Sequence, residues 1–184
     1  MSGERNNMGI EIERKFTVKK LPENLENYPF HEIEQAYLNV HPAIRVRRQD
    51  DIYYMTYKGT PGDMPSQKQR GDISQVEYNM PLDKESYEHM SSKADGNVIR
   101  KTRYLIPIND DAFDEDYVKA CTEVKSLTIE LDVFKAPFDG TIIAEVEFPN
   151  EDAARNYHPA SWFDEDVTGD PRYHNSVMSR QTFN

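Results

Sequence analysis

The chain has 184 residues, of which 37% are hydrophobic and 30% are charged, and its formal net charge is -11. This composition is typical of a folded globular protein and excludes an intrinsically disordered chain. The excess of acid disfavours non-specific binding to nucleic acid or to an anionic membrane, because both attract basic surfaces.

The cysteine content and the hydropathy of the chain limit the cellular compartment in which we expect it. The lone cysteine, Cys121, excludes a disulfide framework and favours a reducing compartment. No apolar run approaches the roughly 18 residues of a membrane-spanning helix, and the first residues lack the apolar core of a signal peptide. We therefore expect a cytoplasmic protein with a single domain over residues 1–184 that binds neither membrane nor nucleic acid. The oligomeric state stays open, a homodimer included.

Apolar–polar alternation predicts short strands along most of the chain, with few helices between them. We expect the strands near residues 9–16, 33–40, 43–49, 52–58, 74–80, 97–106, 125–135 and 140–148. We expect helices near 83–93 with Asp83 as the N-cap, through Tyr117 to Cys121, at 151–157 and in final turns at 175–181. Many antiparallel strands with few crossovers indicate a mainly β fold with flanking helices, in the form of a closed or nearly closed barrel.

Charged residues recur at alternate positions of these strands, so like charges share one strand face. The basic positions are Lys15, Arg45, Arg47, Lys58, Lys101 and Arg103; the acidic positions are Glu11, Glu13, Glu77, Glu130, Asp132, Glu145 and Glu147. Two like charges on one strand face lie about 6–7 Å apart and repel each other unless opposite charge lies between them.

The repetition of this pattern favours a charged inner face over the ordinary outward-facing arrangement. Phosphate oxygens suit the paired bases, because arginine binds them bidentately and lysine as a point charge. Mg²⁺ or Mn²⁺ suits the paired acids, because these hard ions take carboxylate and phosphate oxygens together. Salt bridges between the two sets are the alternative that needs no ligand.

The same residues carry a family resemblance. The run from Glu11 through Glu13 to Lys15 resembles the ExExK signature of the CYTH, or triphosphate tunnel metalloenzyme, family. The resemblance continues in order through Arg45-x-Arg47, Lys58-Gly59, Glu77-Tyr78, Lys101-x-Arg103-Tyr104, Glu130-x-Asp132-x-Phe134, Glu145-x-Glu147 and the closing Val167-Thr168-Gly169-Asp170…Tyr173…Asn175. It covers nearly the whole chain.

This resemblance implies an eight-stranded antiparallel β-barrel that forms a charged tunnel and binds a triphosphate beside divalent metal. The phosphate-binding residues it implies are Lys15, Arg45, Arg47, Lys58, Lys101 and Arg103. The metal-binding residues it implies are Glu11, Glu13, Asp132, Glu145 and Glu147, with Glu77, Glu130 and Tyr173 in support. One departure is Gln75, where many relatives carry an acid.

The implied reaction is metal-dependent hydrolysis of a triphosphate, of which inorganic tripolyphosphate is the leading substrate and nucleoside triphosphates are further ones. Positioned cations neutralise the phosphate oxygens that repel an attacking water. The catalytic candidates are Glu11 and Glu13, whose carboxylates could orient or deprotonate that water, and Lys101, near the leaving oxygen or on a phosphate.

Other functions remain open at this point. Some relatives convert ATP to cyclic AMP and pyrophosphate, so an adenylate cyclase is the second enzyme hypothesis. Thiamine triphosphate is a further substrate option. A non-catalytic polyphosphate- or nucleotide-binding module is the third hypothesis, and Gln75 in place of an acid keeps it open.

Overall fold

A computed structural model describes residues 9–59 and 74–183. The chain forms two compact units. Unit 1 contains residues 1–11, 32–100 and 171–184, and unit 2 contains residues 12–31 and 101–170. Each unit is built around antiparallel strands, and each is described by itself below. No helix among the described residues is both long and apolar enough to span a membrane.

Unit 1 carries a sheet in the order β5-β4-β3-β2, with every neighbouring pair antiparallel. The strands are β2 (Phe30–Val40, in this unit from Glu32), β3 (Ala43–Gln49), β4 (Ile52–Gly59) and β5 (Ser74–Leu82). The helices are α1 (Lys84–Ser91), η3 (Pro171–Tyr173) and α4 (Asn175–Met178). Asp83 caps α1 as predicted, because its side chain accepts a hydrogen bond from the Ser86 N–H at 2.7 Å.

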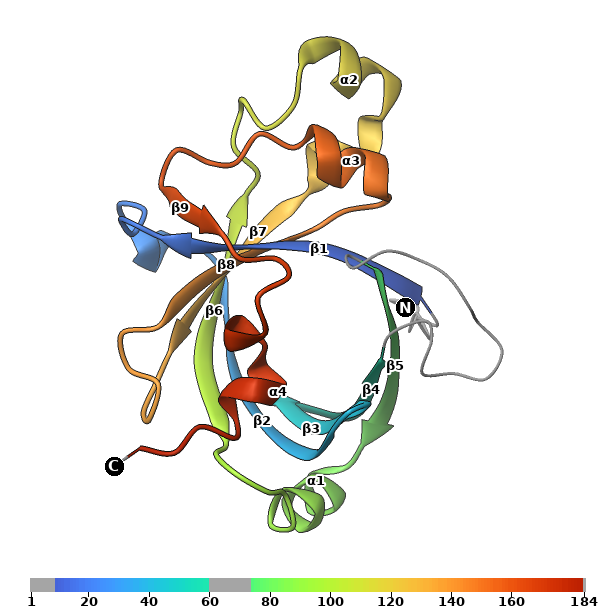
Figure 1. The fold of residues 1–184 in the computed structure, drawn as a ribbon, viewed down its shortest axis with the longest axis vertical. Coiled ribbons are helices and arrows are strands. Elements are labelled where there is room, and N and C mark those ends of the chain that lie inside the picture. Colours follow the sequence, from blue (N-terminus) through green and yellow to red (C-terminus); the bar gives the residue numbers. More distant parts are fainter. Residues whose placement is uncertain (1–8, 60–73, 184) are drawn as a thin grey trace. The chain divides into compact units, whose positions relative to one another are not determined.

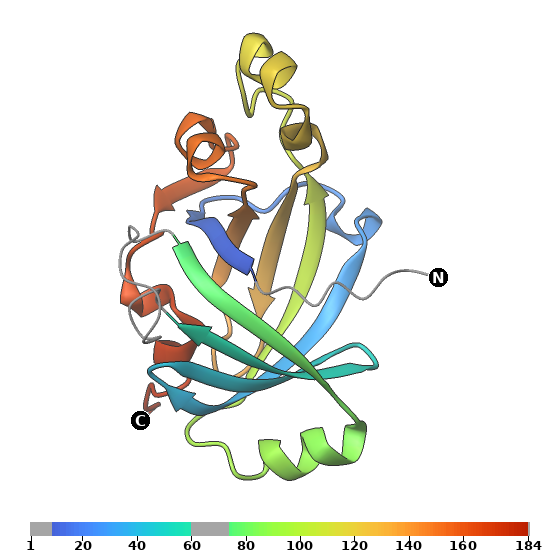
Figure 2. The ribbon, with the colours of Figure 1, turned by 90° about the vertical axis from the view of Figure 1, so that its right-hand side faces the viewer.

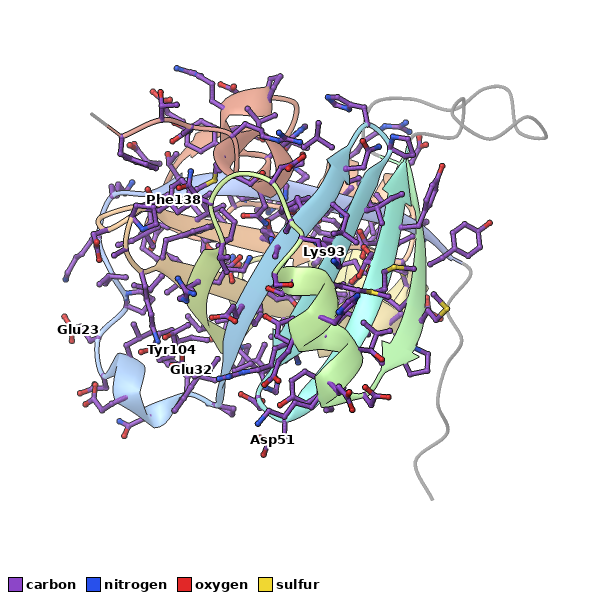
Figure 3. The ribbon with its side chains drawn as sticks, turned by 90° about the horizontal axis from the view of Figure 1, so that it is seen from below. Glu23, Glu32, Asp51, Lys93, Tyr104 and Phe138 are labelled. Atoms are coloured by element: carbon purple, nitrogen blue, oxygen red, sulfur yellow. The ribbon has the colours of Figure 1, made fainter. Side chains whose placement is uncertain are left out.

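The apolar face of this sheet packs against α1, which lies across the strands in Figure 3. Ala36, Val46 and Tyr87 form the buried centre of that contact. The ring of Tyr53 on β4 lies 5.3 Å from the ring of Tyr87 on the helix. Because side chains alternate along a strand, this packing turns Arg45 and Arg47, the neighbours of Val46, to the other face of the sheet. Figure 3 also labels Asp51, an exposed residue in the β3–β4 turn.

Unit 2 carries a sheet in the order β6-β7-β8-β1-β9, again antiparallel throughout. The strands are β6 (Ile99–Pro107, in this unit from Lys101), β7 (Thr128–Phe134), β8 (Ile142–Glu147), β1 (Gly9–Val18, in this unit from Ile12) and β9 (Phe163–Asp166). The helices are η1 (Leu25–Asn27), α2 (Glu115–Ala120), η2 (Thr122–Ser126) and α3 (Glu151–Asn156). Figures 1 and 2 show α2 and η2 in the connection between β6 and β7.

Aromatic side chains build the core of unit 2 on the face away from the charged positions. Phe16 stacks on Phe163 with ring centroids 4.6 Å apart, and Tyr157 lies against Phe16 at 6.1 Å and Phe148 at 5.2 Å. Leu131 and Val146 are also fully buried. Each sheet therefore buries its apolar residues on one face, so its charged positions face the other way, as the strand alternation predicts.

The predicted strands are all present, and β9 is an addition. Phe163–Asp166 contains a single apolar residue and three acids, so alternation gives no signal for a strand there. The segment pairs with β1, where Phe16 faces Asp166 and Val18 faces Phe163. The predicted short helix through Tyr117 corresponds to α2, and Phe113 before it is buried against Tyr117 and Tyr157.

The end of the chain docks on the loop after α1, within unit 1. The Ser179 carbonyl accepts a hydrogen bond from the Asn97 backbone N–H at 2.7 Å, and the Asn97 side chain donates to the Gln181 carbonyl at 2.7 Å. Gly96 allows this approach because its φ is +75°, and a Cβ added there would lie 2.2 Å from the Ser179 oxygen.

We expect Gly96→Ala to destabilise the protein more than Gly140→Ala does. Gly140 also has a positive φ, +87°, but no described atom lies within 4 Å of an added Cβ. Gly140→Ala therefore costs about 1–2 kcal/mol for the left-handed backbone alone. Gly96→Ala adds the displaced Ser179 carbonyl, about 1–3 kcal/mol more. Chemical denaturation of both variants measures the difference, and equal losses would contradict the docking of the chain end.

Candidate functional site

The polar face of unit 1 is the side of the sheet that carries Arg45 and Arg47. Cross-strand pairing aligns its residues in rows: Arg47 lies between Gln35 and Tyr54, and Arg45 lies between Tyr37 and Thr56. Lys58 lies opposite Glu77 in the neighbouring pair of strands. Both arginines are buried, Arg45 at 7% exposure and Arg47 at 9%. These two guanidinium groups are therefore shielded from bulk water.

Arg47 is held by neutral groups. Its Nε and Nη2 donate to Oε1 of Gln35 at 3.1 and 2.9 Å, and its Nη1 donates to the Tyr54 hydroxyl at 3.2 Å. The guanidinium also lies 5.8 Å from the centre of the Tyr54 ring. A carbonyl and a hydroxyl orient the cation without cancelling its charge, so that charge remains available to an anion.

Acids approach the other cations of this face. Nζ of Lys58 pairs with Glu11 at 2.5 Å and lies 3.9 Å from Glu77 Oε2. Nη2 of Arg45 lies 3.7 Å from that same oxygen. Burial acts to raise the pKa of Glu77, but Arg45 and Lys58 outweigh it and lower that pKa. Glu77 is therefore a carboxylate at neutral pH, shared by two cations at long range.

The polar face of unit 2 centres on Arg103, whose guanidinium is surrounded by acids. Nε and Nη2 of Arg103 donate to the two oxygens of Asp132 at 2.7 Å each, and Nη2 also reaches Glu145 at 2.8 Å. Nη1 donates to Glu130. Asp132 is fully buried and pairs also with Lys101, which is itself fully buried. This face therefore consists of a continuous network of ion pairs.

Lys15 extends this network along β1. Its Nζ lies 2.6 Å from Glu145 and 3.3 Å from Glu13. Burial acts to lower the pKa of Lys15, but Glu13 and Glu145 raise it well above its ordinary value. Burial likewise acts to raise the pKa of Glu145, but Lys15 and Arg103 hold it well below its ordinary value. Both groups are charged at neutral pH.

The lowered pKa of Glu145 predicts a pH dependence of stability. Because the folded pKa lies below the unfolded value, the stabilisation is complete above about pH 4.5 and is lost as the pH falls through the folded pKa. We expect Glu145→Gln to lower the melting temperature at pH 7 and to flatten its decline below about pH 4.5. Thermal unfolding from pH 7 to about pH 2 in EDTA tests this. An acid decline equal to that of the wild type would contradict it.

The predicted metal-binding acids do not form a ligand set by themselves. Within residues 9–59 and 74–183, no three His, Cys, Asp or Glu side chains converge closely enough to hold a metal ion. Glu11, Glu13, Asp132 and Glu145 contact cations instead. Glu13 and Glu147 are directly opposite each other on β1 and β8. Like charges in that position repel, so a cation between them would be stabilising.

The structure brings the predicted phosphate- and metal-binding residues together in these two faces. Glu11, Arg45, Lys58 and Glu77 form one group in unit 1, with Arg47 beside them. Lys15, Glu13, Glu145, Asp132, Lys101, Arg103 and Glu130 form the other in unit 2. Glu147 is exposed and lines a pocket of about 410 Å³ together with Glu130 and Glu123. Tyr173 is half-buried in η3, 5.7 Å from the Arg172 guanidinium, and the side chain of Gln75 is outside the described residues.

Gln35 and Tyr37 were not predicted to be part of the polar face. These side chains carry no charge, so a search for paired charges passes over them. Alternation along β2 could have indicated them, because it places Gln35 and Tyr37 on the same face of the strand. The pairing of β2 with β3 then sets them opposite Arg47 and Arg45.

Comparison with known proteins identifies the family. The profile of the CYTH domain matches residues 9–160. The chain is 32% identical to an inorganic triphosphatase of Nitrosomonas europaea, over 92% of this chain and 96% of that protein. It is 28% identical to an inorganic triphosphatase of Acetivibrio thermocellus, over 96% of this chain and 97% of that one. The chain therefore belongs to the CYTH domain family, as its motifs indicated.

A solved structure agrees with this assignment. The crystal structure of an inorganic triphosphatase aligns with a TM-score of 0.62 and 29% identity, covering 96% of this chain and 98% of the other. The similarity supports the predicted fold class, a mainly β antiparallel barrel with flanking helices. Membership of this family of metalloenzymes also supports metal dependence, without specifying the ion.

Proposed function

We propose that this protein is a metal-dependent triphosphatase that hydrolyses inorganic tripolyphosphate, with nucleoside triphosphates as further substrates. Two relatives that match nearly the full chain are inorganic triphosphatases. The observation that carries the proposal is the burial of five of the six predicted phosphate-binding cations on the polar faces of the sheets: Lys15, Arg45, Arg47, Lys101 and Arg103. A buried arginine such as Arg47, oriented by neutral groups, is suited to an anion that enters from solvent.

The predicted phosphate-binding cations differ in whether they are paired with acids. Arg45 and Arg47 make no hydrogen bond to an acid within the described chain, and we propose that they hold phosphate oxygens directly. Lys58 joins them from β4. In unit 2, Lys15, Lys101 and Arg103 are ion-paired in the absence of substrate. We propose that substrate oxygens share these donors with the carboxylates, and that Lys101 holds phosphate.

The carboxylates fit a divalent ion in chemistry, because Mg²⁺ and Mn²⁺ prefer oxygen ligands. We propose Glu13 and Glu147 as the first ligands, since their opposed positions across β1 and β8 favour a shared cation. Asp132 and Glu145 of unit 2 would be further candidate ligands if substrate competes for Lys101 and Lys15. In unit 1, Glu11 would be a candidate if substrate competes for Lys58. A bound ion supplies charge neutralisation on the phosphate oxygens.

The protein's own residues then orient the reaction. The cations withdraw charge from the phosphate group, which lowers its repulsion of water. Of the carboxylates, Glu13 is half-buried and lies 3.3 Å from Lys15 Nζ, so it is accessible to water. We propose that Glu13, or Glu11 two residues before it, accepts the proton of the attacking water.

A phosphate-release assay tests the proposed function. The purified protein is incubated with tripolyphosphate, ATP, thiamine triphosphate or pyrophosphate, in Mg²⁺, in Mn²⁺ and in EDTA. We expect rapid release from tripolyphosphate with metal and none in EDTA. Release from no triphosphate would overturn the proposal, and formation of cyclic AMP from ATP would favour the cyclase alternative.

We also propose that residues 1–184 act as one domain. The family profile spans residues 9–160, and this range includes segments of both units. A reducing, cytoplasmic setting remains our proposal, on the basis of the single cysteine.

A further inference from the structure

Tyr37 is a buried polar residue that neither the motifs nor the charge pattern singled out. It lies on β2 directly opposite Arg45 on β3, and it is 2% exposed. A tyrosine hydroxyl has one proton to donate and lone pairs to accept with, and when buried it usually uses both. Which groups surround the hydroxyl therefore decides what its proton can do.

The side chain of Gln35 is one of the groups beside the Tyr37 hydroxyl, and its orientation can be determined. Gln35 is fully buried, and Arg47 donates two hydrogen bonds to its Oε1 at 3.1 and 2.9 Å. A guanidinium has only donors, so Oε1 must face Arg47 and Nε2 must face the other way. Nε2 lies 3.1 Å from the Tyr37 hydroxyl. Since Nε2 can only donate, the hydroxyl accepts from Gln35 and keeps its own proton.

Arg45 is the second group beside the Tyr37 hydroxyl, and it also offers only hydrogen-bond donors. Burial alone would lower the pKa of Arg45, but the neighbouring Tyr37 and Glu77 raise it above its ordinary value. Arg45, like Arg47, has only donors, so it too cannot accept the proton of Tyr37. Among the described residues, Nε of Arg45 is a buried donor without any hydrogen-bond acceptor.

Two neighbouring buried donors therefore lack an acceptor within the described chain: the Tyr37 O–H and the Arg45 Nε–H. Leaving such groups unpaired costs free energy, so a site of this kind is suited to bind an acceptor supplied by a ligand. Because one of the donors is a cation, a negatively charged oxygen is the best match.

We propose that Tyr37 is a further substrate-binding residue, whose hydroxyl forms a subsite with Arg45 Nε for one phosphate oxygen. The inference rests on the proposed triphosphatase function and adds a neutral donor to the same face. Gln35 acts as a positioning residue: it orients Arg47 through Oε1 and turns the Tyr37 proton away through Nε2.

The test is binding of inorganic tripolyphosphate to the full chain in EDTA, measured by isothermal titration calorimetry. Tyr37→Phe removes the hydroxyl and leaves the buried ring. We expect its Kd to rise about 10- to 100-fold, because the lost hydrogen bond is to a charged group. In the assay with metal, KM should rise by a similar factor while kcat changes little, which a general loss of structure would not produce.

Tyr53→Phe is the matched control. Tyr53 lies on β4 but faces the apolar cluster around Tyr87, so loss of its hydroxyl should leave the Kd unchanged. Arg45→Lys is the second variant, which keeps the charge and removes Nε–H. We expect weaker binding from it as well, and it provides the test if Tyr37→Phe does not fold.

The outcomes separate the two claims. If the wild type neither binds nor cleaves tripolyphosphate, the proposed function fails and the subsite fails with it. If the wild type binds and cleaves tripolyphosphate but Tyr37→Phe binds as tightly as Tyr53→Phe, the subsite alone is wrong.

Discussion

Replacing Arg103 by methionine should lower the free energy of unfolding of the metal-free protein by about 3–5 kcal/mol. Arg103 is the shared partner of Asp132, Glu145 and Glu130, and Asp132 is fully buried. Without the guanidinium, the buried carboxylates of Asp132 and Glu145 lose a cation that they share, and their mutual repulsion is no longer offset by it. Urea denaturation at pH 7 in EDTA measures the loss.

Arg100→Met is the control for this change. Arg100 lies on the same strand, β6, but is exposed and pairs with Glu34 at 2.7 Å. An exposed pair of this kind contributes about 0–1 kcal/mol. If the two variants lose similar stability, the ion-pair network of unit 2 is not the structural element that we describe.

Replacing Arg47 by methionine should reduce kcat/KM for tripolyphosphate by about 100- to 1,000-fold. Arg47 is the buried cation whose charge Gln35 and Tyr54 leave unneutralised. If Arg47 holds a phosphate oxygen as we propose, its loss removes a positive charge that offsets the negative charge of the phosphate during phosphoryl transfer. Steady-state kinetics at saturating Mg²⁺ measure the effect.

Arg48→Met separates this effect from a change in overall charge. Arg48 is the next residue on β3 but is exposed on the opposite face. The Arg48→Met substitution removes the same charge from the protein as Arg47→Met does, and we expect it to change kcat/KM by less than about threefold. Equal losses from the two variants would mean that net charge, and not a cation held on the polar face, sets the rate.

The alternation of charges predicted much of the site, because the pleat of a strand determines which residues share a face. Arg45, Val46 and Arg47 illustrate this: the valine packs toward α1, and both arginines turn to the polar face. The strand boundaries followed from the same periodicity. Asp83 was predictable as an N-cap because its side-chain chemistry is local to the helix start.

Strand β2 shows why charge alone was insufficient. Its acid Glu34 faces α1, where Tyr87 donates to it at 2.8 Å and Arg100 at 2.7 Å. The neutral Gln35 lies on the polar face instead. The charged residue of this strand therefore lies on the face opposite the site. Only the pairing of β2 with β3 shows that Gln35 contacts Arg47.

The partners of the charged residues could not be predicted, because they depend on the register between strands. The sequence places Glu130, Asp132 and Glu145 on polar faces, but not beside one guanidinium. The register sets Glu130 opposite Glu145 and Arg103 opposite Asp132, which brings the three acids to Arg103. Strand β9 was not predicted, because its acidic sequence has no alternation typical of a strand. It forms a strand because it pairs with β1.

A crystal structure with tripolyphosphate and Mn²⁺ would test the central claim most directly. We expect phosphate oxygens within hydrogen-bond distance of Arg45 and Arg47, and anomalous scattering from Mn²⁺ beside Glu13 and Glu147. Phosphate bound only at exposed lysines, with every ion pair of the polar faces unchanged, would contradict the claim that Arg45 and Arg47 bind substrate phosphate.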